Sequence, residues 1–345
     1  MLRVFATPCS AGNPYCDLLH DAIEHERING EQIEVSEYRS KKLIADGCDV
    51  WHIHWPEIFY QNLGKATAAA NVVRILALLL WARMQGARIV WTIHNLEGHE
   101  SNHPFIESIF LRAFAVLVHG TISMSEWVQR RAFRAYPVLA KKPAAVIPHG
   151  HYRTAYPQEI DPQKARTILE LSSDDRVGLY FGNIRGYKKV PSFIRTFRRL
   201  DRTDARMLVA GNPHTEKLER EVQQEAAQDS RVTTALDFIP KDRVQVYFRA
   251  ADFAVLPQEE FLNSGSALLA LSFDTPVIAA KNGSMIDLQK RIGADWVRLF
   301  RETLTSNDLE EAIEWADYPR SRRAPLDGLD WPSIAHRTCG FYQRL

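Results

Sequence analysis

The chain has 345 residues, of which 46% are hydrophobic and 25% are charged, the composition of an ordinary globular protein. Its 43 lysines and arginines balance 42 acidic residues, so the net charge gives no support to a nucleic-acid-binding protein. The length predicts two domains. The longest apolar run, Ile75 to Ala82, is too short to span a bilayer, and the first residues lack the apolar core of a signal peptide.

The cysteines give a further indication of the compartment. Their spacing contains no pair typical of a metal site, and we expect four reduced thiols, at Cys9, Cys16, Cys48 and Cys339. Reduced thiols and the missing signal peptide predict a cytoplasmic protein.

Short apolar runs alternate with helical patterns along the whole chain. The expected strands are Leu2–Ala6, Val50–His54, Arg88–His94, Ala115–Gly120, Ala144–Pro148, Val177–Gly182, Arg206–Ala210, Val232–Phe238, Phe253–Leu256 and Pro276–Ala280. The expected helices include Ala66–Gln85, Ser125–Tyr136, Lys189–Arg199, Thr215–Ala227 and Lys241–Ala250. This alternation predicts an α/β protein with two doubly wound, Rossmann-like domains facing a central cleft, each with a parallel sheet of about five strands covered by helices on both faces.

A polar, proline-containing stretch between Gly150 and Gln163 predicts the boundary between the domains. The expected division is one domain over residues 1–152, a second over 153–326 and a C-terminal segment over 327–345, helical after Pro332.

In such sheets, ligands bind at the carboxyl ends of the strands, where loops lead into helices. The stretch from Asn263 to Ser266 opens an apolar helix with small polar residues, which suits a phosphate at the helix N-terminus, although ordinary N-capping also explains it. The loop after Val177–Gly182 carries three cations, Arg185, Lys188 and Lys189, which suit a diphosphate. Together the two loops predict a diphosphate-binding site.

Nine of the twelve histidines precede residue 151, several of them at expected strand ends. The two groups are His52, His54 and Glu57, and His94, Glu97, His99, Glu100 and His103. The second group lacks the register of a helical metal motif, so we favour general-base or hydroxyl-binding roles over a metal site. We expect His52 to point away from His54 and to be structural.

Nine segments carry a resemblance to a known family. In chain order they read "DVWHIHWPE", "WTIHNLEGHE", "TISMSEW", "VIPHG", "FGNIRGYKK", "LVAGNP", "FIP", "AADFAVLP" and "NSGSALLALSFDTPVIA". This series resembles the GT-B glycosyltransferases, and most closely the family-4-like bacterial enzymes of exopolysaccharide assembly, including mannosyltransferases. The resemblance covers nearly the whole chain.

The resemblance and the loops together predict the site residues. The candidates for the catalytic base are His94, Glu100 and His99. The residues expected to bind the donor diphosphate are Arg185, Lys188, Asn263, Ser264, Gly265 and Ser266. The residues expected at the donor base and sugar are Phe238, Ile239, Pro240 and Glu260, with Glu259 beside them. The residues expected on the acceptor side are Gly12, Asn13 and His54.

One departure from the family bears on the mechanism. Retaining members carry two glutamates around the helix start; Glu260 keeps the first position, but Leu269 takes the second. An inverting mechanism is therefore favoured, in which a first-domain base deprotonates the acceptor hydroxyl. Cations and helix N–H groups would stabilise the leaving diphosphate.

The resemblance implies a hexosyltransferase that uses a nucleoside-diphosphate sugar, GDP-mannose or a UDP-sugar, in polysaccharide biosynthesis. It also implies an acceptor-binding first domain, a nucleotide-sugar-binding second domain, a C-terminal helix that returns to the first domain, and no cofactor or metal. Two alternatives remain: a non-catalytic nucleotide-sugar or glycan-binding protein, and a sugar-nucleotide epimerase.

The acceptor is expected to be a glycan or a lipid-linked oligosaccharide. Residues 112–142 contain six cations and a single acid, Glu126, and the helix from Val72 to Arg83 is apolar and contains Trp81. Both features suit peripheral contact with the anionic inner face of the membrane. A solvated helix face and core packing explain them as well.

Overall fold

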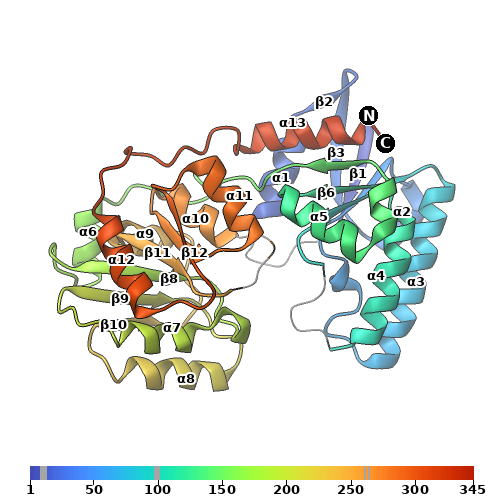
Figure 1. Cartoon of the computed structure of the whole chain (residues 1–345). Helices are drawn as coiled ribbons and strands as arrows, with labels where there is room; N and C mark the ends of the chain where they lie inside the picture. Colours follow the sequence, from blue (N-terminus) through green and yellow to red (C-terminus); the bar gives the residue numbers. More distant parts are fainter. Residues whose placement is uncertain (8–13, 97–101, 260–261, 263–264) are drawn as a thin grey trace. The chain divides into compact units, whose positions relative to one another are not determined.

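The computed structural model describes residues 1–7, 14–96, 102–259, 262 and 265–345. The chain forms two compact units. Unit 1 comprises Met1–Gly150 and Gly328–Leu345, and unit 2 comprises His151–Asp327. Figure 1 shows that each unit is a sheet with helices packed around it.

Unit 1 is built on a seven-stranded sheet with the strand order β2-β3-β1-β4-β5-β6-β7. Neighbouring strands are parallel, except for the antiparallel pair β2 and β3. The strands are β1 (Leu2–Ala6), β2 (Arg27–Ile28), β3 (Glu31–Glu37), β4 (Val50–Ile53), β5 (Arg88–Ile93), β6 (Gly120–Ser123) and β7 (Ala144–Val146).

The helices of unit 1 include one from the C-terminal end of the chain. They are α1 (Tyr15–Glu24), α2 (Ser40–Asp46), α3 (Lys65–Met84), α4 (Pro104–Leu117), α5 (Glu126–Ala135) and α13 (Trp331–Tyr342), with the 3-10 turns η1 (Pro56–Phe59) and η2 (Pro137–Lys141). α13 packs on α1, and Trp331 joins the core cluster that contains Tyr15 and Leu19. A Cβ on Gly150 would lie 2.6 Å from the Trp331 ring, so this return of the chain requires glycine there.

Unit 2 has a six-stranded sheet in which all neighbours are parallel, with the order β10-β9-β8-β11-β12-β13. Its strands are β8 (Arg176–Phe181), β9 (Ala205–Ala210), β10 (Val232–Ala235), β11 (Phe253–Leu256), β12 (Val277–Ala280) and β13 (Val297–Phe300). Its helices are α6 (Pro162–Ile168), α7 (Val190–Phe197), α8 (Glu216–Ala226), α9 (Val244–Ala250), α10 (Gly265–Ser272), α11 (Gly283–Ile292) and α12 (Ser306–Ala316), with the 3-10 turn η3 (Gly186–Lys188). The α/β class with two Rossmann-like parallel sheets is therefore confirmed.

The strand expected at Ala115–Gly120 is wrong. Helix α4 continues through this segment to Leu117, because Phe114 and Ala115 extend its buried face, and the strand begins at Gly120. Lys142 Nζ donates to carbonyls at the end of this helix, including that of Ala115 at 2.9 Å, and so caps it.

Three strands were missed. β2 and β3 are largely exposed, so their sequences lack the apolar signal of a buried parallel strand, and β13 is a short strand at the sheet edge. The expectation of two five-stranded sheets is corrected to seven and six strands in the described chain.

Candidate functional site

The carboxyl edge of the unit 2 sheet carries an unpaired cation. Lys188 lies in η3, directly after β8, and within the described residues its Nζ has no hydrogen-bond or ion-pair partner. A Cβ built on Gly182 would lie 3.9 Å from both Lys188 Nζ and Ser266 Oγ, so the two side chains flank one point at the end of β8. Burial, and then the nearby charge of Arg185, lower the pKa of Lys188 to about 8. A desolvated cation without a counter-ion is what a diphosphate site requires before its ligand binds.

Two crossing loops hold this cation in place. The backbone N–H of Gly182 donates to Ala210 O at 2.9 Å, and Ile184 N–H donates to Asn212 O at 2.9 Å. A Cβ on Gly211 would lie only 2.0 Å from Gly182 O, and Gly211 has a φ of 150°. Only glycine permits this close approach, so the "AGNP" sequence fixes the loop that leads to Lys188.

Lys189 and Glu259 form an ion pair beside Lys188. Lys189 Nζ lies 2.7 Å from Glu259 Oε1, and Thr303 Oγ1 donates to the same oxygen at 2.6 Å. The hydrogen bonds from Lys189 and Thr303 lower the pKa of Glu259. Glu259, expected near the donor sugar, is thus ionised and joined to the loop that carries Lys188.

The start of α10 supplies the second predicted donor loop. Gly265 and Ser266 form its first turn, and Leu269 is half-buried on the same helix. Asn263, Ser264 and Glu260 lie outside the described residues, so their predicted roles remain predictions. The eight-residue helix directs its N-terminal N–H groups to the edge where Lys188 lies.

The loop expected at the nucleotide base follows β10. Phe238 is 65% exposed, Ile239 is half-buried and Pro240 is exposed. An exposed aromatic ring is available for stacking on a base, and the predicted role of this loop remains a prediction.

The carboxyl edge of unit 1 has a different character, because it gathers histidines and aromatic rings. His54 Nδ1 and His94 Nε2 are hydrogen-bonded at 3.1 Å, and the His54 backbone N–H donates to Thr7 Oγ1 at 3.0 Å. His52 is held by Thr92 Oγ1 at 2.7 Å and by the Tyr342 hydroxyl at 2.6 Å. The C-terminal helix α13 therefore supports this cluster.

Aromatic side chains enclose His94. Trp55 stacks on its ring with a centroid distance of 4.0 Å, and Tyr15 meets it edge-on at 4.9 Å. The ring centroid of His149 in turn lies 4.7 Å from that of Tyr15. Trp55, Tyr15 and His149 were not predicted as site residues, although Trp55 follows directly after His54 in "HIHWPE" and His149 ends "VIPH".

All of these histidines are neutral at pH 7. Burial lowers the pKa of His52 to about 3 and of His149 to about 4, and it holds the pKa of His54 and His94 well below the usual value. The ring centroids of His20 and His54 are 5.9 Å apart, and burial lowers the pKa of His20 to about 4. The cluster is thus a set of neutral donors and acceptors rather than a cationic site.

Glu57 is a carboxylate at the same edge, close to His94 in the fold. Asn95, the neighbour of His94, donates from Nδ2 to Glu57 Oε1 at 3.2 Å. Burial raises the pKa of Glu57, which makes it a stronger base than an ordinary glutamate.

Two predictions about the histidines need correction. His52 does not point away from His54, because residues two apart on a strand share a face, and the two ring centroids are 4.1 Å apart. His54 is 0% exposed, so in this structure it positions His94 and offers no surface to an acceptor. His94 itself is 7% exposed.

Four further predicted site residues lie outside the described part of the chain: His99, Glu100, Gly12 and Asn13.

Three side chains of unit 1 bring possible metal ligands together. Ligand atoms of Cys16, His20 and His54 all lie within 4.8 Å of one another. Cys16 is disulfide-bonded, however, and a thiolate is the form in which cysteine binds a metal. The group is therefore a poor metal site. The expectation of four reduced thiols is also wrong, and among the described cysteines only Cys48 and Cys339 are free.

Comparisons with known proteins agree with this geometry. Residues 175–314 match the family described as glycosyl transferases group 1. The chain is 26% identical over 333 residues to the GDP-mannose:glycolipid 4-beta-D-mannosyltransferase of Xanthomonas campestris pv. campestris, across 95% of this chain and 87% of that protein.

Solved structures share the fold at low sequence identity. Sucrose-phosphate synthase from Thermosynechococcus elongatus matches with a TM-score of 0.69 at 16% identity, over 100% of this chain and 99% of that one. HepE of Anabaena, solved in complex with UDP and glucose, matches with a TM-score of 0.64 at 16% identity, over 100% and 98%. The protein is thus a GT-B glycosyltransferase whose second unit carries a domain of the glycosyl transferases group 1 family.

Proposed function

We propose that the protein transfers mannose from GDP-mannose to a lipid-linked glycan, with inversion at the anomeric carbon and without a metal ion. The observation that carries the proposal is the desolvated Lys188 at the carboxyl edge of unit 2, next to Gly182 and Ser266, with no ion-pair partner in the part of the chain that the structure describes. That arrangement suits the diphosphate of a nucleotide sugar.

The positive charge needed by the leaving diphosphate is supplied by the protein itself. Lys188, Arg185 and the N-terminus of α10 lie at one edge of the sheet. Preorganised donors of this kind stabilise charge as it develops in the transition state and take the place of a metal cation.

The choice of donor and of stereochemistry rests on the relative from Xanthomonas. Its name states that it forms a β-mannosyl linkage from GDP-mannose. Mannose is α-linked in GDP-mannose, so a β-linked product requires inversion. A UDP-sugar is the rival donor, in keeping with the UDP bound to HepE of Anabaena.

The acceptor hydroxyl requires a base on unit 1. His94 is neutral, but His54 engages its Nε2 and burial holds its pKa well below the usual value, which makes it a weak base. Glu57, with its raised pKa and its tie to Asn95, is a further candidate that sequence reasoning did not assign. The stacked rings of Trp55 and His94 offer an apolar face suited to a sugar ring.

The lipid part of the acceptor requires access to a membrane, and we assign it to the outer faces of α3 and α4. The two helices pack against each other, and Figure 1 shows them side by side. Each has a stripe of exposed apolar side chains at helical spacing. The stripes consist of Val73, Leu80 and Met84 on α3 and Phe105, Ile109 and Val116 on α4.

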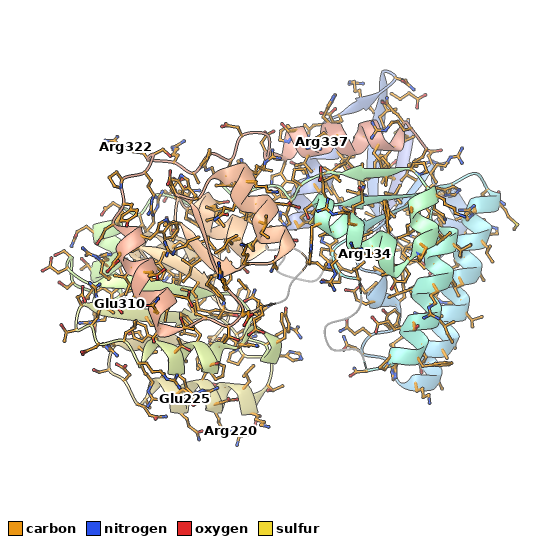
Figure 2. The ribbon with its side chains drawn as sticks, viewed as in Figure 1. Arg134, Arg220, Glu225, Glu310, Arg322 and Arg337 are labelled. Atoms are coloured by element: carbon orange, nitrogen blue, oxygen red, sulfur yellow. The ribbon has the colours of Figure 1, made fainter. Side chains whose placement is uncertain are left out.

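Exposed cations accompany these stripes in unit 1. Arg112 lies on α4, and Arg130, Arg131 and Arg134 lie on α5, where Figure 2 labels Arg134. An amphipathic face with cations nearby suits binding to the surface of an anionic bilayer. Lys142 does not contribute, because its charge caps α4.

Helix α3 also has the length and composition of a membrane span. Over the described residues it is the one helix that does, and most of it is not buried. Its buried side, including Val72, Ile75 and Leu79, packs within unit 1. Contact with the bilayer surface through the exposed side is compatible with that packing, whereas crossing the bilayer is not.

The transfer is tested with purified protein, GDP-mannose or UDP-glucose, and a membrane extract containing lipid-linked glycans, with and without EDTA. We expect transfer from GDP-mannose only, unaffected by EDTA, with a β-anomeric signal in the proton NMR spectrum of the released glycan. Conversion of a nucleotide sugar without an acceptor would instead indicate an epimerase. Nucleotide binding without any transfer would indicate a non-catalytic protein.

Membrane binding is tested separately by liposome flotation. We expect the protein to float with vesicles containing anionic lipid at low salt, and Phe105→Glu to reduce the bound fraction. Tyr318→Ser, at an exposed aromatic residue of unit 2, is the matched control and should leave binding unchanged. Equal binding of the wild type and Phe105→Glu would exclude this face.

A further inference from the structure

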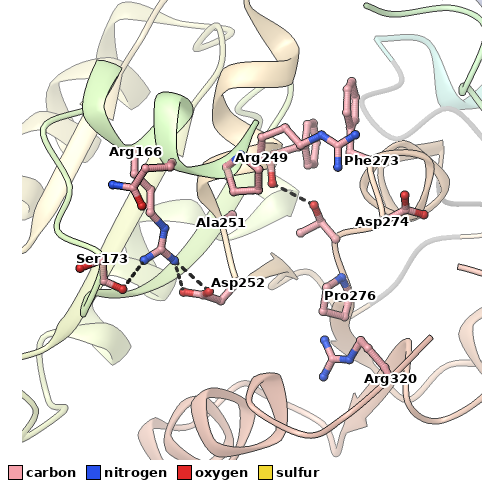
Figure 3. Close-up of a pocket in the computed structure, with 13 residues that line it drawn as sticks. Arg166, Ser173, Arg249, Ala251, Asp252, Phe273, Asp274, Pro276 and Arg320 are labelled. Carbon is pink, nitrogen blue, oxygen red and sulfur yellow. Dashed lines mark hydrogen bonds and ion pairs between the residues drawn. The ribbon is translucent and has the colours of Figure 1, made fainter. Parts of the chain in front are cut away.

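Unit 2 contains a cavity on the edge of the sheet opposite to Lys188. The cavity has a volume of about 460 Å³ and lies at the amino ends of β8, β11 and β12, where Ser173, Asp252 and Pro276 precede the strands. Figure 3 shows the lining side chains, three of which are arginines. In a parallel sheet this edge lies across the strands from the candidate donor site, so the two sites are separate.

The first arginine has a structural role. Arg166 Nη2 donates to both carboxylate oxygens of Asp252 at 2.9 Å. Its Nη1 donates to the carbonyls of Ser172, Ser173 and Asp175 at 3.1, 3.0 and 3.1 Å. These bonds hold the loop before β8 in place, and Asp252 balances the charge of Arg166.

The other two arginines have no acid partner within the described residues. Arg249 donates to Gln158 Oε1 at 3.3 Å, and its buried Nε has no acceptor. Arg320 donates to Trp315 O at 2.7 Å and lies over the rings of Trp296 and Trp315, and its buried Nε also has no acceptor. Burial lowers the pKa of Arg320, and the nearby carboxylates of Asp295, Asp252 and Asp317 offset part of that shift.

The acids of the cavity wall are already engaged. Asp252 accepts from Arg166 and from the Val177 N–H at 2.7 Å. Asp274 accepts from Arg153 at 2.7 Å and from the Ala324 N–H at 2.9 Å. The charge of Arg320 is partly offset by Asp295, Asp252 and Asp317, whereas Arg249 has no acid partner among the described residues. A buried cation of this kind can bind an anion.

A second role for arginines at this edge is to bind the carbonyl ends of helices. Arg320 does this with one nitrogen, at the end of α12. Arg249 lies in the last turn of α9 but, in the described structure, it donates to a side chain and to no helix carbonyl. Helix capping thus explains part of the hydrogen bonding of Arg320, and it does not explain the position of Arg249.

We propose that this cavity binds a phosphomonoester, such as a sugar phosphate, at a site distinct from the donor site. The phosphate would pair with the guanidinium group of Arg249 and with the free Nε side of Arg320, since guanidinium groups bind phosphate bidentately. The body of the ligand would contact Phe248, Phe273 and Pro276, which supply the apolar part of the wall. A volume of about 460 Å³ is within the range of small-molecule sites, and it exceeds what a lone phosphate ion fills.

The test is equilibrium binding of mannose 1-phosphate and of inorganic phosphate to the full chain, measured by calorimetry. It is run on the wild type and on Lys188→Ala, so that binding at the candidate donor site is recognised by its loss. We expect one sugar phosphate per chain that survives Lys188→Ala, and an affinity reduced about tenfold or more by Arg249→Gln. Arg249→Lys, which retains the charge, should lose less.

Control variants separate this result from misfolding and from general attraction. Arg220→Gln removes an exposed arginine of α8, labelled in Figure 2, and should leave the affinity unchanged. An unchanged thermal midpoint shows that Arg249→Gln is folded. Inorganic phosphate that binds as tightly as the sugar phosphate identifies free phosphate as the source of the anion. No binding, or binding that neither Arg249→Gln nor Arg320→Gln weakens, would overturn the proposal.

Discussion

The carboxyl edges of the two sheets have the same architecture and opposite chemistry. In unit 1 the strand ends carry neutral, buried histidines and aromatic rings centred on His94. In unit 2 the corresponding edge carries Lys188, which has no counter-ion among the described residues, and a glycine crossing fixes its loop. A neutral edge suits a hydroxyl-bearing acceptor, and a cationic edge suits a diphosphate. The same arrangement of strands thus serves two purposes through a few residues at the strand ends.

The largest expected effect comes from the crossing that holds the cationic edge. Gly211→Ala places a Cβ 2.0 Å from Gly182 O at a φ of 150°, so the two loops must separate. We expect a loss of more than about 3 kcal/mol in the free energy of unfolding, measured by urea denaturation. Gly186→Ala, in the loop after β8 that carries Lys188, is the control, because nothing lies within 4 Å of its Cβ position. Similar stability of both variants would mean that the crossing does not constrain the loop.

The second effect concerns the unpaired cation itself. Lys188→Ala should weaken the binding of the nucleoside diphosphate by about 1.5–3 kcal/mol, roughly 10- to 150-fold, because one charge-assisted contact is lost. Stability should hold or rise slightly, since a desolvated charge is removed. Lys217→Ala on α8, which is exposed, is the control. Unchanged nucleotide affinity in Lys188→Ala would remove the diphosphate site from unit 2.

The neutral edge is tested by pH. His20, His52 and His149 have pKa values of about 4, 3 and 4 in the folded protein, below the usual value of 6.5. The unfolded chain therefore binds protons first as the pH falls, so the stability from these groups is complete above pH 6.5 and is lost below it. We expect each histidine to contribute a loss of about 1 kcal/mol between pH 6.5 and 5.5.

Urea denaturation followed by tryptophan fluorescence measures this effect mainly in unit 1, which holds six of the eight tryptophans. His20→Leu removes one titrating group and should flatten the pH dependence by the share of one histidine. Stability that is constant over this range would contradict the neutral, buried state of the cluster.

The contrast between the edges was only partly predictable from the sequence. The cationic loop was found because Arg185, Lys188 and Lys189 follow a strand end directly, and charge is visible in sequence. The histidines were also visible, but their surroundings come from distant parts of the chain. Tyr15 from α1 and Trp55 from the end of β4 contact His94, and His149 from beyond β7 contacts Tyr15.

The fold, too, was predictable only where its signal is local. Buried parallel strands are visible in the sequence as apolar runs, and nine of the ten expected strands coincide with observed ones. β3 and the edge strand β13 were missed because one-sided or partial burial leaves a weaker pattern. The arginine-lined cavity of unit 2 has no sequence signal, since Arg249 and Arg320 belong to segments far apart in the chain and only the fold brings them to one cavity.

The smallest expected effect concerns the one acid that was predicted at the cationic edge and lies in the described structure, Glu259. Its pair with Lys189 is partly exposed, with side chains 42% and 33% exposed, so Glu259→Gln should cost less than about 1 kcal/mol of stability. If Glu259 serves only to hold Lys189, nucleotide affinity should be nearly unchanged, and Thr303→Val, which removes the other hydrogen bond to Glu259, should behave alike. A loss of donor affinity in Glu259→Gln but not in Thr303→Val would show that the carboxylate itself contacts the donor. The cationic edge would then also recognise a neutral hydroxyl group, as the edge of unit 1 is proposed to do.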